Sequence, residues 1–150
     1  MTSILCYMTL LLCAVALSEG CSCAEPVPPS DWKGNAYEYW NKQRLCAADY
    51  AIKGKVLERS DDPLSVGSVI YKIKVTQSFI GPFDEKEIVE LKTKADEAQC
   101  GVHLNLEGTQ NIYLLTGGNS NGQLEIELCG WYEPWKDDTR EKIRKALKKC

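Results

Sequence analysis

The cysteines are the residues of this chain whose type and spacing are best suited to chemistry. The 150 residues include eight cysteines, and six of these lie beyond an apolar run at the start: Cys21, Cys23, Cys46, Cys100, Cys129 and Cys150. An even number of cysteines in an exported chain is typical of a disulfide framework. A thiolate metal site would need Cys-x-x-Cys pairs or several histidines, and the sequence has neither. We therefore expect three disulfides, for which six cysteines allow fifteen pairings.

The apolar run at residues 4–17, ILCYMTLLLCAVAL, predicts export. It is shorter than the roughly 20 residues of a membrane-spanning helix, and the small residues Ser18 and Gly20 precede a potential cleavage site before Cys21. We interpret residues 1–20 as a signal peptide, with cleavage after Ala16 as the alternative. The expected product is secreted and extracellular, and it has no membrane span.

Cys21 and Cys23 are separated by one residue at the expected start of the mature chain. The prolines that follow favour an extended backbone, in which both side chains point the same way and the backbone would have to buckle to join them. Each should therefore pair with a different, distant cysteine. Two such bridges would clamp an end of the chain that normally frays.

Composition and motifs argue against several functions. The chain has 18 basic and 21 acidic residues, and removal of residues 1–20 would take away only Glu19, so no basic excess favours nucleic-acid binding. His103 is the single histidine, and the sequence has no Gly-x-Ser-x-Gly elbow, phosphate loop or histidine-rich metal triad. We expect a binding protein or inhibitor rather than an enzyme, with no cofactor of its own.

The elements that position the cysteines are mostly strands. Strand patterns, with period-two alternation clearest in the second and fifth, occupy residues 50–58, 68–79, 87–92, 111–116 and 123–128. Turn-forming residues separate them at 59–67, 81–85 and 117–122.

Two helices are expected to flank the strands. The first, at residues 35–45, opens with Asn35 and has Glu38 at the capping-box position, and the second spans residues 137–149. Together these elements predict a mainly β fold, a five-stranded OB-type barrel with flanking helices and three disulfides, in one domain of residues 21–150.

Several motifs resemble one family. CSCAEP after a signal peptide, YKIKVTQSFIG, AQCG, and Cys-x4-Pro-Trp within IYLLTGGNSNGQLEIELCGWYEPW are similar to the netrin-like module of the tissue inhibitors of metalloproteinases, or TIMPs. The resemblance covers essentially all of residues 21–150. Because the chain ends at Cys150, we expect the second, disulfide-rich domain of vertebrate TIMPs to be absent, as in short single-module proteins secreted by parasitic nematodes.

The resemblance implies a disulfide pairing and a binding edge. The implied pairs are Cys21–Cys100, Cys23–Cys129 and Cys46–Cys150. In the family, the amino nitrogen and carbonyl oxygen of the first cysteine chelate the catalytic zinc of a target protease, and the next side chain enters its specificity pocket. The residues that would contact a matrix-type zinc metalloproteinase here are Cys21, Ser22, Cys23, Ala24, Ala98, Gln99 and Cys100.

Simple chemistry supports such a role for the end of the chain. An α-amine has a reference pKa near about 8, so part of it is unprotonated at neutral pH and available to a metal. Nitrogen and oxygen of one residue form a five-membered chelate that displaces the water on which the protease depends.

The sequence also departs from the family pattern. Residues 24–45 make a longer spacing between cysteines than is usual, Glu25 would repel an acidic rim, and Ala98-Gln99 stand where the family has serine and an apolar residue. Two alternatives therefore remain. The first two cysteines could simply staple the barrel. The module could also be a secreted immunomodulatory or matrix-binding protein that acts on host immune-cell or matrix components, for which the GWYEPW aromatics offer a surface.

Overall fold

The computed structural model describes residues 20–108 and 110–150, so the expected signal peptide lies outside the described residues. The elements are α2 (Ala36–Cys46), β1 (Tyr50–Asp61), β2 (Ser68–Ile80), β3 (Ile88–Lys94), η1 (Glu97–Gln99), β4 (Ile112–Ser120), β5 (Gln123–Glu125), β6 (Glu133–Pro134) and α3 (Thr139–Leu147). Among the residues described, no helix is long and apolar enough to cross a bilayer.

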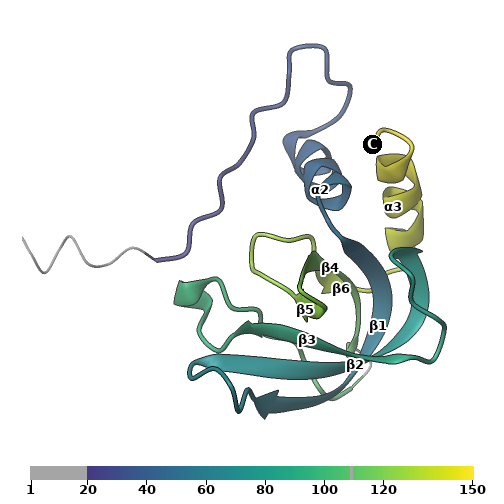
Figure 1. Cartoon of the computed structure of the whole chain (residues 1–150). Coiled ribbons are helices and arrows are strands. Elements are labelled where there is room, and N and C mark those ends of the chain that lie inside the picture. The colour runs from purple at the N-terminus through teal and green to yellow at the C-terminus, as the bar shows by residue number, and fades with distance from the viewer. Residues whose placement is uncertain (1–19, 109) are drawn as a thin grey trace, which may run out of the picture.

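Strands β1 to β5 close into a barrel (Figure 1). The order is β1-β2-β3-β5-β4, and β1 closes the ring because it pairs with β2 along one edge and with β4 along the other. All these pairings are antiparallel except β3 with β5. The expected mainly β barrel with two helices and three disulfides is confirmed.

Alternation along β2 explains why this segment is a strand. Tyr71, Ile73 and Val75 are fully buried inside the barrel, whereas the residues between them face outward or are only half-buried. The interior is so close that a side chain at Gly54 of β1 would collide with the side chain of Ile73. The described side chains inside the barrel therefore form a closely packed core.

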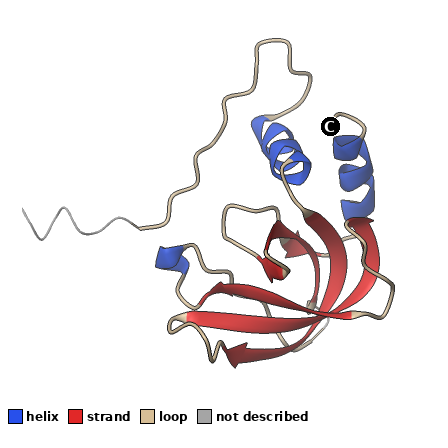
Figure 2. Cartoon of the chain, in the orientation of Figure 1, coloured by secondary structure: helices blue, strands red, loops and turns tan. Residues whose placement is uncertain are grey.

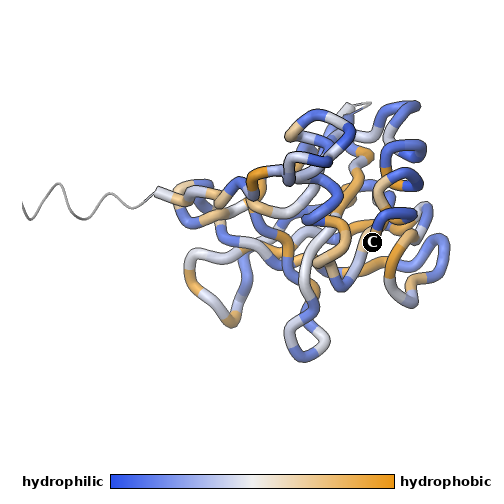
Figure 3. The backbone as a smooth tube through the Cα atoms, turned by 90° about the horizontal axis from the view of Figure 1, so that it is seen from above, coloured by the Kyte–Doolittle hydropathy of each residue, from blue (hydrophilic) through white to orange (hydrophobic). Residues whose placement is uncertain are grey.

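The two helices lie side by side at one end of the barrel (Figure 2). Helix α2 begins as expected, since the Asn35 side chain accepts a hydrogen bond from the backbone N–H of Glu38 at 2.8 Å. Both helices pack over a second apolar cluster that includes Leu45, Leu114 and Ile143. Much of the backbone of α3 is coloured hydrophilic in Figure 3, which fits a helix that buries only one narrow stripe.

The aromatic GWYEPW segment does not form the exposed surface considered for the immunomodulatory or matrix-binding alternative. Trp131 is only 2% exposed and belongs to the cluster beneath the helices. Tyr132 and Trp135 are half-buried against the two cores, and the Trp135 ring stacks on Phe79. These aromatics are packing residues.

Several strand boundaries differ from the expected ones. Strand β1 continues to Asp61 rather than ending at residue 58, β2 ends at Ile80 rather than at 79, and β3 spans Ile88–Lys94 rather than 87–92. Strands β5 and β4 differ as well. Strand β5 ends at Glu125 rather than at residue 128, because the chain leaves the ladder there: the N–H of Leu128 donates to the carbonyl of Cys100 at 2.9 Å. Strand β4 continues to Ser120, through most of the expected turn at 117–122. Only Asn121 and Gly122 form the turn, both at positive φ, as two-residue hairpins require.

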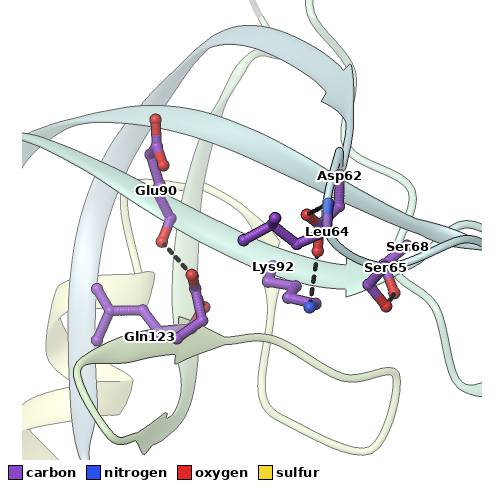
Figure 4. A network of polar contacts seen from close by, with 8 residues as sticks. Asp62, Leu64, Ser65, Ser68, Glu90, Lys92 and Gln123 are labelled. Atoms are coloured by element: carbon purple, nitrogen blue, oxygen red, sulfur yellow. Dashed lines mark hydrogen bonds and ion pairs between the residues drawn. The ribbon is translucent and has the colours of Figure 1, made fainter.

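A polar network fixes the turn between β1 and β2 to β3 (Figure 4). The Asp62 carboxylate accepts a hydrogen bond from the Leu64 N–H at 2.8 Å and pairs with the Lys92 ammonium at 2.7 Å. The hydrogen bond from Lys92 is the main reason that the pKa of Asp62 is lowered. The anchored turn leaves Leu64 and Val66 exposed at its tip.

Candidate functional site

Two neighbouring disulfides hold the segment at Cys21 against the barrel. Cys21 is bonded to Cys100 and Cys23 to Cys129, the same pairs that the resemblance implies. The sulfur atoms of Cys21, Cys100 and Cys129 all lie within 4.8 Å of one another. Because every one of these sulfurs is in a disulfide, the cluster is a covalent clamp rather than a thiolate metal site.

The third disulfide joins Cys46, at the end of α2, to Cys150, and this too is the implied pair. It links the two helices rather than the segment at Cys21. The six cysteines therefore divide into a clamp of four at one edge of the barrel and a single bridge between the helices.

A hydrogen bond positions the backbone nitrogen of Cys21. Its N–H donates to the carbonyl oxygen of Ala98 at 2.9 Å. Together with the bond to Cys100, this fixes both the side chain and the backbone of the same residue. Cys21 and Cys23 are half-buried, whereas Ser22 between them is exposed, as is Ala24. The sequence-predicted residues 21–24 thus present one free side chain between two tethered ones.

The segment that Cys21 contacts is the 3-10 turn η1 and the residue after it, Cys100. The Asp96 side chain caps η1 by accepting the Ala98 N–H at 2.9 Å, and Cys100 leaves the turn with a left-handed φ of 65°. Ala98 and Gln99 are exposed beside the disulfide. The two short segments named from the sequence, 21–24 and 98–100, therefore form one continuous edge.

Gly101 makes this turn possible. A side chain there would collide with the backbone oxygen of Lys94 and lie 2.7 Å from that of Asp96. The N–H of Gly101 also donates to the Asp96 oxygen at 3.0 Å. Sequence reasoning missed Asp96 and Gly101 as supports of the edge. An aspartate three residues before Gln99 is the signal of an N-cap that could have revealed the first of them.

The cavity beside the edge has more acidic than basic residues. Glu125, Glu127 and Arg44 line this cavity of about 480 Å³ together with Cys23 and Ala24. Glu25 is exposed and lies in the sequence between Ala24 and Pro26, which both line this cavity. A positively charged rim on a binding partner would be the favourable match for these carboxylates.

Comparison with known proteins gives consistent matches over this chain. A family model described as "Tissue inhibitor of metalloproteinase" matches residues 19–150. The chain is 34% identical to metalloproteinase inhibitor 4 of Rattus norvegicus over 126 residues, 79% of this chain and 50% of that protein. It is 30% identical to metalloproteinase inhibitor 3 of Gallus gallus over 142 residues, 90% of this chain and 59% of that protein.

A third relative gives the same picture. Metalloproteinase inhibitor 2 of Homo sapiens is 33% identical over 137 residues, which is 84% of this chain and 54% of that protein. The chain thus spans about half the length of the curated relatives it matches. All four edge cysteines lie within the residues matched by the family model.

Proposed function

Because the chain belongs to the tissue inhibitor of metalloproteinase family, we propose that it is a secreted inhibitor that blocks the catalytic zinc of a matrix-type metalloproteinase with its own N-terminus. The observation that carries the proposal is the clamp on Cys21: one disulfide on its side chain and one hydrogen bond on its nitrogen. The names of three relatives, metalloproteinase inhibitors 2, 3 and 4, support the choice of target class.

The proposed inhibitor forms when a signal peptidase cuts before Cys21. Cleavage converts the nitrogen of Cys21 from an amide into an amine, whose lone pair is available to a metal. One N–H of this amine keeps the bond to the Ala98 oxygen, which orients the lone pair away from the barrel. The carbonyl oxygen of the same residue supplies the second ligand.

The clamp reduces the entropic cost of binding. A free chain end would lose roughly 1 to 2 kcal/mol for each residue ordered at the protease. Here Cys21 and Cys23 are already fixed by their bridges, so little order remains to be imposed. The exposed side chain of Ser22 enters the specificity pocket, and Ala98 and Gln99 contact the rim beside it.

The test changes only the end of the chain. One protein begins at Cys21, as verified by mass, and the other carries one additional alanine before it. The extension turns the amine into an amide and places a residue where the zinc would lie. Each loss of about 1.4 kcal/mol weakens inhibition tenfold, and we expect the extension to weaken it by orders of magnitude in total.

The fold should not respond to this extension. Both clamp disulfides are retained, and an exposed terminal residue changes stability by about 0.5 kcal/mol at most. Matched melting curves for the two proteins provide this control. Equal inhibition of a panel of zinc proteases by both forms, or inhibition by neither, would reject zinc chelation by Cys21.

Replacement of the exposed Ser22 by a bulky residue gives a second arm. The substitution should change the ranking of proteases in the panel while the melting temperature stays constant, because no packed neighbour is disturbed. An unchanged ranking would mean that this side chain does not enter a specificity pocket.

A further inference from the structure

The Cys23–Cys129 disulfide lies in the wall of the cavity beside the edge. Both cysteines line this cavity of about 480 Å³, and both are half-buried. The volume lies within the range of about 300 to 1,000 Å³ in which proteins bind small molecules. Cys21 and Cys100 do not belong to the lining. A small molecule that enters the cavity therefore contacts Cys23–Cys129 and not the neighbouring disulfide.

The charges of the lining are mixed. Arg44 carries a positive charge and lies over the Trp40 ring, with 4.8 Å between its guanidinium carbon and the centre of the ring. Glu125 and Glu127 carry negative charges. Because the carboxylates exceed the cation by one charge, the lining suits an uncharged small molecule better than an anion.

The sulfur of Cys129 lies beside the second disulfide of the clamp. The sulfur atoms of Cys21, Cys100 and Cys129 all lie within 4.8 Å of one another, although only Cys21 and Cys100 are bonded among these three. Thiol–disulfide exchange is the attack of a thiolate on a disulfide sulfur, and a thiolate already held next to its target reacts faster than one that must diffuse to it. A thiolate formed on Cys129 would therefore lie next to the disulfide that it can attack.

The disulfide between the helices differs on both points. Cys46 and Cys150 are exposed, and neither belongs to the lining of the cavity. Among the described residues, neither of their sulfurs belongs to a group of three that lie close together. Cys46–Cys150 is therefore an internal reference, since a thiol in solution reaches it directly and its opening has no neighbouring disulfide to attack.

We propose that the cavity beside the edge is a thiol-exchange site, in which a small uncharged monothiol opens Cys23–Cys129 and Cys129 then opens Cys21–Cys100. The exchange breaks the disulfide that fixes the side chain of Cys21, so it is a route by which a thiol releases the clamp. It requires no protease and no zinc, and its test is therefore independent of the proposed inhibition.

The exchange takes two steps, each of which breaks one S–S bond and forms another. First, the thiolate of the small molecule attacks the sulfur of Cys23, and Cys129 leaves as a thiolate. Second, this thiolate attacks Cys21 or Cys100, and the other of the two leaves as a thiolate and takes a proton from water. The product holds the small molecule on Cys23, one new disulfide at Cys129 and one free thiol. No oxidant or further reductant is consumed.

The first experiment maps the products of a limited reaction. The secreted protein is treated with 2-mercaptoethanol under native conditions, quenched with excess N-ethylmaleimide and mapped without reduction by mass spectrometry. We expect mercaptoethanol on Cys23, Cys129 joined to Cys21 or Cys100, and maleimide on the cysteine that is left over.

Two results of this mapping would overturn the proposal. Mercaptoethanol on Cys23 together with maleimide on Cys129 would mean that the second step does not occur. Absence of mercaptoethanol from Cys23 after Cys46–Cys150 has opened completely would mean that the cavity does not admit the thiol.

The second experiment measures how fast the Cys21–Cys100 disulfide is lost when the first step is impossible. The double variant Cys23→Ser and Cys129→Ser lacks the disulfide at which the exchange begins, so the loss should slow by about tenfold or more. If Cys23–Cys129 only stiffened the clamp, its removal would expose the neighbouring disulfide and speed the loss. An equal or higher rate in the variant therefore rejects the exchange. If the variant does not fold, the product map of the unmodified protein decides the outcome.

A matched variant controls for the removal of a disulfide as such. Cys46→Ser with Cys150→Ser removes the bridge that lies outside the cavity. The rate at which Cys21–Cys100 is lost should then stay within about twofold of that of the unmodified protein. A tenfold fall in this variant as well would mean that the slowing is not specific to the clamp.

Mild denaturant distinguishes exchange in the folded protein from exchange through unfolding. Below the unfolding transition, the rate at which mercaptoethanol appears on Cys23 should change by less than about twofold, because the cavity is present in the folded state. A rate that rises in proportion to the unfolded population would show that the thiol reaches Cys23 only after unfolding, and the site would not exist.

Discussion

Removal of the Cys23–Cys129 disulfide and removal of the Cys46–Cys150 disulfide should cost the fold similar amounts of stability yet differ in their effect on the proposed inhibition of a metalloproteinase. The first bridge belongs to the clamp at Cys21, and the second joins the helices. Each is removed by replacing both cysteines with serine. The comparison separates loss of the clamp from loss of stability, because the two variants are matched in the latter.

The stability costs follow from the lengths of chain that each bridge closes while the other two remain. The helix bridge closes a path of about 45 residues, from Cys46 back to Cys23, across to Cys129 and on to Cys150. The loop-entropy relation gives about 4.0 kcal/mol for this length.

The clamp bridge closes a shorter path. It runs from Cys23 to Cys21, across to Cys100 and on to Cys129, about 32 residues. The same relation gives about 3.7 kcal/mol. Unfolding in denaturant should therefore show losses within about 1 kcal/mol of each other, and both should be smaller if strain in the native bridges offsets part of the entropy.

Inhibition should distinguish the two variants. Without Cys23–Cys129, about one residue beside Cys21 regains backbone freedom, and re-ordering it on the protease costs roughly 1 to 2 kcal/mol, about tenfold in affinity. Without Cys46–Cys150, the edge at Cys21 is untouched and the inhibition constant should stay within about twofold. Equal inhibition by both variants, measured where both are folded, would refute the argument that the clamp orders the inhibitory edge.

Three further substitutions or titrations test the fold. The hydrogen bond from Lys92 lowers the pKa of Asp62 in the folded state. The pair therefore stabilises the protein at pH values above the ordinary pKa of aspartate, and this stability is lost as the pH falls through the lowered pKa. Asp62→Asn should make the loss of stability at acidic pH smaller, and denaturation midpoints measured at a series of pH values test this. Gly101→Ala should lower the free energy of unfolding by about 1 to 3 kcal/mol, because the new methyl group meets the Lys94 carbonyl, and thermal melting measures this. Burial raises the pKa of Tyr50 and also that of Tyr132, so an ultraviolet titration should count at least one more ionising tyrosine after unfolding than before, and an equal count would contradict the burial of Tyr50.

The barrel could be predicted from the sequence because local patterns and tertiary packing agree there. Alternation along β2 and the cap at Asn35 each depend on residues that lie close together in the chain. The disulfide pairs, in contrast, could not be predicted from local patterns. Spacing and composition left fifteen pairings open, and only the resemblance to a known family indicated the pairs found in the structure.

Features that depend on distant residues could not be read from the sequence. Apolar and polar residues alternate up to residue 128, but β5 ends at Glu125 because the N–H of Leu128 donates its hydrogen bond to the carbonyl of Cys100 instead of to a neighbouring strand. The cavity beside the edge depends on Arg44 and Glu127, which no local pattern connects. Strand β6 is only two residues long and pairs with β4, so its sequence has no periodicity to detect.

The disulfide pattern also sets an order for biosynthesis. All three bridges join a cysteine within the first 46 residues to one at residue 100 or later. While the chain is being made, the early cysteines therefore emerge with only non-native partners available to them, and β1 likewise waits for β4 to close the barrel. Folding must therefore largely follow synthesis. Any premature bridge among the early cysteines has to be exchanged, which takes seconds to hours without a catalyst. The yield of folded protein then depends on the thiol–disulfide balance of the compartment in which the chain folds.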